Sequence, residues 1–101
     1  VIWEGGHKIM RAAFKNRFAD IAPDNWAEED VTKAYQVARQ NVFAACNRVL
    51  IHAKPGEAFL VHRLALHGVA RWQAGQGRRA IAYFRPEFAS GARSAEWLTA
   101  P

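Results

Sequence analysis

The sequence predicts a mainly β chain with a helical insertion, in which the strands form part of a small β-barrel. Three observations carry this prediction. From residue 57 onward the chain reads as an apolar strand with a histidine, His67, at its end, then an open loop, and then a second apolar strand, residues 78–84, that opens with Arg78. Over residues 7–46 the apolar spacing is instead helical. A histidine and an arginine at the ends of neighbouring strands suit a metal-binding imidazole that faces an anion-binding guanidinium.

The first strand and the first helix are separated by a glycine pair. Val1–Trp3 is a short β-like run, and Gly5-Gly6 closes it. From His7 to Phe18 the apolar residues recur every four positions, which puts them on one helical face. We therefore expect an amphipathic helix here, with basic residues on its wetter faces. The apolar positions are Met10, Phe14 and Phe18.

A proline separates this helix from a second one. Pro23 restricts the residue before it and donates no backbone hydrogen bond, so it ends the first helical pattern. Asn25 and Glu28 have the spacing of a capping box, and the acidic run 28–30 suits the positive end of a new helix. We expect this helix to run for about five turns and to end near Cys46. Its apolar stripe consists of Val31, Ala34, Tyr35, Ala38, Val42 and Ala45.

After residue 47 the pattern becomes extended. Val49–Ala53 is a β-branched and aliphatic run, and Lys54–Glu57 has the composition of a tight turn. Ala58–His62 is then the return strand. Arg78–Phe84 is apolar on both faces, so it is predicted to be a buried strand. The tail is expected to hold one short helical turn around Ser94–Leu98.

These elements are expected to form a single partial domain over residues 1–101 of a longer protein. The lone Cys46 cannot form an internal disulfide, which favours a reducing, cytoplasmic location. The sequence has no apolar run long enough to span a bilayer, and residues 1–8 lack the layout of a signal peptide. The expected divisions are a barrel strand and loop (1–6), a helical insertion (7–46), C-terminal barrel strands (47–86) and a tail (87–101).

The net charge of +5 lies mostly in the second half of the chain. Residues 51–101 hold seven Lys or Arg against three Asp or Glu. A basic balance can indicate nucleic-acid binding. The arginines are dispersed along the strands and their loop, however, and do not form a basic run. A nucleic-acid partner is therefore not favoured.

A block of motifs across residues 55–81 gives the clearest indication of function. It contains Pro-Gly-Glu at 55–57, His-x-x-x-x-His-Gly at 62–68, and Arg-Arg-Ala-Ile at 78–81, eleven residues after the second histidine. This block resembles the C-terminal part of the phytanoyl-CoA dioxygenase-like family of Fe(II)/2-oxoglutarate-dependent oxygenases. The Gly-Gly-His-Lys at 5–8 is similar to a Gly-Ser-His-Lys loop in that family.

The resemblance implies the C-terminal half of a double-stranded β-helix (jelly-roll) barrel, with the helices packed on its outside. His67 corresponds to the distal histidine of the family's 2-His-1-carboxylate metal triad. Arg78 corresponds to the arginine that pairs with the far carboxylate of 2-oxoglutarate, whereas His62 and Arg79 match positions with no role to carry over. The implied cofactors are Fe(II) and 2-oxoglutarate, and the implied activity is hydroxylation of a small organic substrate. We expect both site residues to point into one cavity.

The sequence departs from the family pattern in two ways. Trp72 and Ala74 stand where the family usually has Asn and Ser or Thr. None of the four histidines begins a His-x-Asp/Glu motif, which supplies the other two metal ligands in the family. We expect the remainder of the parent chain to supply them, so this chain alone should be inactive and hold no catalytic residue. Two alternatives stay open: a non-catalytic jelly-roll binding module, and a small basic nucleic-acid-binding domain.

Overall fold

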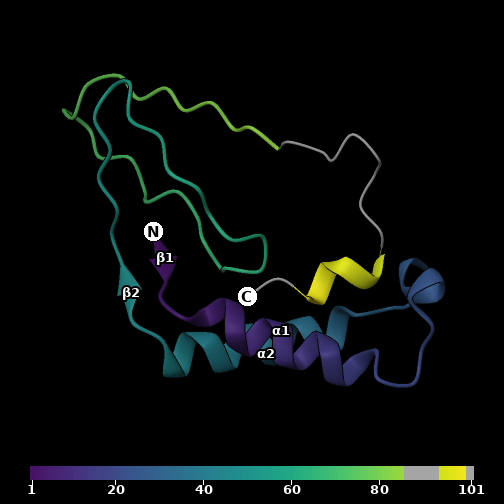
Figure 1. The fold of residues 1–101 in the computed structure, drawn as a ribbon. Helices are drawn as coiled ribbons and strands as arrows, with labels where there is room; N and C mark the ends of the chain where they lie inside the picture. The colour runs from purple at the N-terminus through teal and green to yellow at the C-terminus, as the bar shows by residue number, and fades with distance from the viewer. Residues whose placement is uncertain (86–93, 100–101) are drawn as a thin grey trace.

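The structure is a computed structural model that describes residues 1–85 and 94–99. Within this part of the chain, two α-helices pack together beside one two-stranded sheet. A long segment with little regular structure, residues 50–85 (the extended segment), lies mostly to one side of the helices (Figure 1). The elements in order are β1 (Ile2–Trp3), α1 (Gly6–Arg17), the 3-10 helix η1 (Pro23–Glu28), α2 (Thr32–Ala45), β2 (Arg48–Val49) and the 3-10 helix η2 (Ser94–Leu98).

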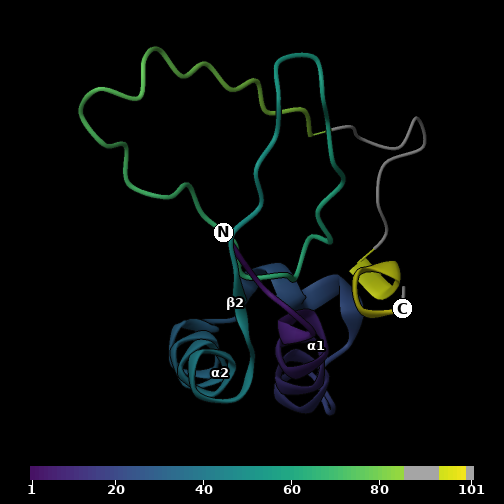
Figure 2. The same ribbon diagram turned by 90° about the vertical axis from the view of Figure 1, so that its left-hand side faces the viewer.

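Helices α1 and α2 lie side by side, as the view along them shows (Figure 2). The apolar positions that recur every four residues in α1 all face inward, and Met10 is only 2% exposed. Helix α2 contributes Ala38 and Val42 to the same core. The two helices approach closely at Gly6, because a Cβ atom there would lie 2.7 Å from Cγ1 of Val42. Glycine is thus required at this crossing.

Two further segments complete the core. Leu64 comes from the turn 62–65, and Leu98 comes from η2; both are buried against the helices. At the far end of α1, the ring of Trp26 in η1 stacks on Phe18 with centroids 4.7 Å apart. The core is therefore a helical one that recruits single residues from the rest of the chain.

Strand β1 joins three parts of the chain that are distant in sequence. On one edge it pairs antiparallel with β2, with Ile2 opposite Val49. On its other edge, the amide of Trp3 donates to the carbonyl of Leu66 at 3.1 Å, and Ile2 forms an isolated antiparallel bridge with His67. This short strand therefore holds residues 66–68 beside the first helix.

The prediction of a mainly β jelly-roll half is wrong. In the described residues the regular structure is mostly helical, and the sheet has only two short strands. Residues 58–62 and 78–84, which were predicted to be strands, form no strand, and residues 78–84 are exposed rather than buried. The side chain of Leu60 is 101% exposed and that of Phe84 is 88% exposed. A β-branched or aromatic run favours extended backbone, but a strand forms only where a neighbouring strand takes up its hydrogen bonds.

Several local predictions are confirmed. The first helix, the short initial strand and the helical turn at 94–98 all form. Residues 54–57 form the expected turn, in which the amide of Glu57 donates to the carbonyl of Lys54 at 3.0 Å and Gly56 has a φ of 87°.

The predicted start of the second helix is wrong. Asn25 does not cap it, because Asn25 lies inside η1, which begins at Pro23. Helix α2 begins at Thr32, where the carboxylate of Asp30 accepts the Thr32 amide at 2.9 Å. The fixed φ of proline suits the first position of a 3-10 turn, so the chain turns once before the longer helix starts. The domain divisions expected from the sequence stay predictions.

Candidate functional site

His67 is held by the backbone on both sides of its position. The bridge to Ile2 fixes the residue itself, and the amide of Gly68 donates to the carbonyl of Val1 at 3.0 Å. The imidazole is solvent-exposed, but its Nδ1 atom lies 2.8 Å from the carbonyl oxygen of Ala65. A carbonyl oxygen can only accept, so Nδ1 carries the proton. The lone pair of the neutral ring is therefore on Nε2, the atom that points away from this hydrogen bond.

Arg78 lies in the exposed extended segment, immediately after a loop that residues on either side close. The indole Nε1 of Trp72 donates to the carbonyl of Gly77 at 3.0 Å, and Arg79 donates to the carbonyl of Ala70 at 2.9 Å. The guanidinium of Arg78 makes no hydrogen bond or ion pair within residues 1–85 and 94–99. No such contact joins Arg78 to His67 in that part of the chain. Their joint site stays a prediction.

Two other histidines meet, which the sequence did not predict. The rings of His7, in the first turn of α1, and His62 have centroids 4.8 Å apart at an interplanar angle of 40°. Partial burial, then His62, Lys8 and Arg11 in decreasing order, hold the pKa of His7 below its ordinary value. The one sequence signal for this contact was that both histidines belong to motifs of the same resemblance.

Residues 1–85 and 94–99 do not form a complete iron centre. Fe(II) sites of the expected type need three side-chain ligands, two histidines and one carboxylate. No cluster of three or more His, Cys, Asp or Glu side chains occurs in the part of the chain that the structure describes. The role of His67 as a metal ligand stays a prediction, and no step that depends on bound iron can be derived from the described residues alone.

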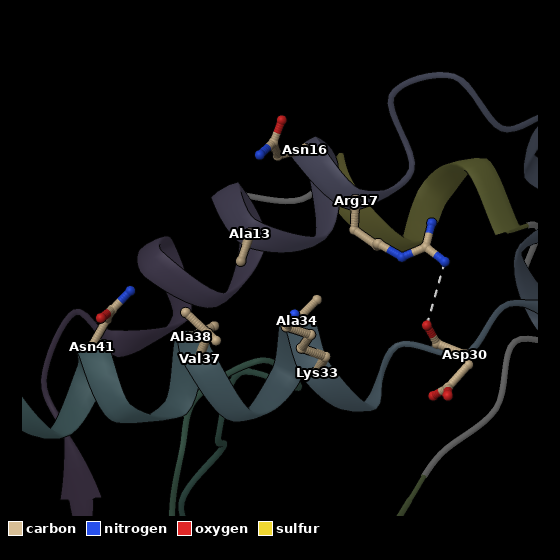
Figure 3. Close-up of a pocket in the computed structure, with 9 residues that line it drawn as sticks. All are labelled: Ala13, Asn16, Arg17, Asp30, Lys33, Ala34, Val37, Ala38 and Asn41. Carbon is tan, nitrogen blue, oxygen red and sulfur yellow. Dashed lines mark hydrogen bonds between the residues drawn. The ribbon is translucent and has the colours of Figure 1, made fainter.

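A pocket of about 390 Å³ lies between α1 and α2 (Figure 3). Small side chains from the two helices line its middle, and Arg17 and Asp30 lie at one end. The guanidinium of Arg17 is already engaged, by the carboxylate of Glu29 at 2.5 Å and by the backbone carbonyl of Asp30 at 3.3 Å. The guanidinium of Arg17 is therefore already paired inside the protein. Its lining residues are Ala13, Asn16, Arg17, Asp30, Lys33, Ala34, Val37, Ala38 and Asn41.

No protein-family model matches the chain, and the comparisons with curated proteins and with solved structures each found no match. Among the described residues, no helix combines the length and the apolar character needed to cross a membrane.

Proposed function

We propose that this chain supplies one metal-binding histidine, His67, and one carboxylate-binding arginine, Arg78, to an Fe(II)/2-oxoglutarate-dependent oxygenase that hydroxylates a small organic substrate. The observation that carries the proposal is the hydrogen bond from Nδ1 of His67 to the carbonyl of Ala65. Metal-binding histidines almost always donate their second ring N–H to a carbonyl or carboxylate, which fixes the tautomer and the ring orientation. An exposed Nε2 lone pair on a backbone-fixed histidine is ready to bind a metal.

The state of the two adjacent arginines supports the choice of Arg78. Arg79 is engaged by the carbonyl of Ala70, whereas Arg78 has no such contact in the described residues. A guanidinium that is free of internal partners can bind a carboxylate of 2-oxoglutarate through two parallel hydrogen bonds.

The exposed extended segment supports the idea that other protein completes the site. Residues 58–62 and 78–84 present large apolar side chains to solvent, including Leu60 and Phe84. Exposed apolar side chains of this size can serve as contacts for a partner. Protein that covers these residues would also bring the remaining metal ligands. The free, half-buried thiol of Cys46 supports a reducing, cytoplasmic setting.

The test uses the longer protein that contains this chain and measures succinate release as a function of 2-oxoglutarate concentration. Arg78→Ala should raise the required concentration strongly, because loss of the guanidinium leaves the cosubstrate carboxylate unpaired, at a cost on the order of 2–5 kcal/mol. Arg79→Ala is the matched control and should have a much smaller effect. A larger effect for Arg79→Ala would contradict the assignment of Arg78.

The isolated chain gives a second test. It should bind Fe(II) only weakly, since one imidazole cannot replace three ligands. Titration calorimetry with Fe(II) under anaerobic conditions measures this directly. Stoichiometric, tight binding that His67→Ala abolishes would show that the chain holds a complete site and would overturn the proposed division of ligands.

A non-catalytic binding module is the second candidate, and the exposed apolar segment favours it. An extended chain with exposed apolar side chains can add to the sheet edge of a partner without any chemistry. The two candidates differ in one measurement. Iron-dependent release of succinate by the longer protein supports the oxygenase, and its absence in a folded protein that binds a partner through residues 58–84 supports the binding module.

A further inference from the structure

The contact between His7 and His62 fastens two separate parts of the fold. His7 belongs to the first turn of α1, and His62 begins the turn 62–65. Their rings lie 4.8 Å apart, and both side chains are half-buried. The turn leads directly into residues 66–68, which pair with β1. The histidine pair therefore sits where the extended segment is attached to the helical core.

His62 also holds the backbone of a core residue. Its Nδ1 atom accepts a hydrogen bond from the amide of Leu64 at 3.1 Å, and its carbonyl accepts the amide of Ala65 at 2.8 Å. Leu64 and Ala65 are both buried. Nδ1 can accept this bond only while it carries no proton. Protonation of the ring would leave the Leu64 amide without its acceptor.

The charged groups that lower the pKa of His7 are all cationic. The charged groups that oppose a proton on His7 are His62 across the contact and Lys8 and Arg11 on the same helix. Further charged groups on the elements that meet here are Lys15 and Arg17 on α1, Arg63 on the turn and Glu96 on η2. Arg63 is directed to η2, where its guanidinium donates to the carbonyls of Glu96 and Trp97.

We propose that the His7–His62 pair is a pH-sensitive latch: the contact between the two rings holds the turn 62–65 against α1, and a proton bound by the pair at acidic pH releases the turn. Two imidazolium rings at this distance repel each other, and the neighbouring cations add to the repulsion. Release would also free residues 66–68 from β1, so His67 would lose its fixed position. The latch does not depend on the proposed metal or cosubstrate.

The direction of the pH dependence follows from His7. Its pKa is lower in the folded chain than the ordinary histidine value of about 6.5, so the unfolded or released state binds more protons. The stability of the closed latch is therefore complete above about pH 6.5 and decreases as the pH falls below it.

The experiment measures amide hydrogen exchange of Leu64 and Ala65 by NMR on the 101-residue chain, at about pH 7.5 and about pH 5.5, corrected for intrinsic exchange. In the wild type, protection of these two amides should be lower at about pH 5.5 than at about pH 7.5, because the released state binds more protons. His62→Asn is the informative variant, because its Oδ1 can still accept the Leu64 amide but the side chain cannot be charged. It should keep protection constant with pH.

His7→Gln should reduce the pH effect in the same assay, and His52→Gln is the matched control. His52 is an exposed histidine of the extended segment, so its replacement should leave the pH effect unchanged. NMR titration of the wild-type His7 ring gives a readout that needs no variant, because the pKa of His7 should lie below the ordinary histidine value of about 6.5. Constant protection of Leu64 in the wild type, or a pH effect that persists in the His7→Gln/His62→Asn double variant, would overturn the latch.

Discussion

Several large apolar side chains are buried in the helical region, residues 1–49 with η2. In the extended segment, residues 50–85, many side chains of the same kind are exposed. Met10 and Val42 are almost completely buried between the helices, whereas Leu60 and Phe84 are almost completely exposed. A helix satisfies its own backbone hydrogen bonds, so its apolar face needs only a second apolar face to pack against. An extended segment makes its backbone hydrogen bonds only with a neighbouring strand, so it needs such a strand before its apolar face can pack in a sheet.

The boundary between the two regions is informative as well. Residues 64–66 belong to the extended segment by sequence, but they pack on the helices and bond to β1. They do so because β1 offers them a free strand edge. The difference between the regions therefore lies in the availability of partners and not in the apolar content of the chain.

The largest expected effect contrasts one truncation in each region. Met10→Ala should lower the free energy of unfolding by about 2–5 kcal/mol, because it removes buried methylene groups and leaves a cavity. Leu60→Ala should change it by less than about 0.5 kcal/mol, because that side chain is fully exposed. Urea denaturation followed by far-UV circular dichroism measures both. Equal losses would mean that residues 50–85 pack in solution and that the contrast between the regions does not hold.

The next effect tests the closeness of the two helices. Gly6→Ala should cost about 1–3 kcal/mol, since the new Cβ atom meets Cγ1 of Val42 at 2.7 Å and valine has little rotamer freedom in a helix. In the background of Val42→Ala the same change should cost much less. A double-mutant cycle on unfolding free energies gives the coupling. If the cycle gives no coupling energy between positions 6 and 42, the two helices do not approach each other closely at Gly6.

A smaller effect concerns the link between the regions. Arg63 donates to the carbonyls of Glu96 and Trp97, and so ties the turn 62–65 to η2. Arg63→Ala should cost about 1 kcal/mol, because charged hydrogen bonds at an exposed site are partly replaced by water. Arg71→Ala, which removes an exposed arginine of the extended segment, is the control and should be neutral. The unfolding temperatures of the two variants measure this. An equal decrease in both would argue against a specific link between the turn 62–65 and η2.

The smallest effect concerns the start of α2. Hydrogen bonds from Thr32 hold the pKa of Asp30 below its ordinary value. The stabilisation is therefore present above the unfolded value of about 4 and is lost as the pH falls through the lower folded value. Asp30→Asn should remove this part of the acid sensitivity. The test is the helical circular dichroism signal of the wild type and of Asp30→Asn, measured between about pH 5 and pH 2. Identical loss of signal in the two proteins would contradict the prediction.

The sequence predicted the helices better than the strands, for a physical reason. Met10, Phe14 and Phe18 define a helical face by local spacing alone, and α1 forms where they indicate. The run 78–84 has an equally clear apolar pattern. A strand also needs a neighbouring strand, however, and the local pattern does not show which segment that would be. The start of α2 was mispredicted because Pro23 favours a separate 3-10 helix, which includes Asn25. The spacing of Asn25 and Glu28 cannot distinguish a capping box from residues inside such a 3-10 helix.

The candidate site was predictable only in part. The sequence singled out His67, and the structure adds the Nδ1 hydrogen bond and the bridge to Ile2, neither of which has a local sequence signal. The contact between His7 and His62 depends on the return of residue 62 to the start of α1, 55 positions away in the chain. Long-range contacts of this kind are set by the packing of the whole fold.

The position of β1 at the centre of three chain segments has a consequence for the order of folding. The chain between Ile2 and His67 is about four times longer than the connection between α1 and α2. Closing the longer loop costs roughly 1 kcal/mol more conformational entropy. We therefore expect the helix pair to form first and the bridge at His67 to form last, on a surface that is already in place. The same bridge should be the first to open under denaturant, ahead of global unfolding.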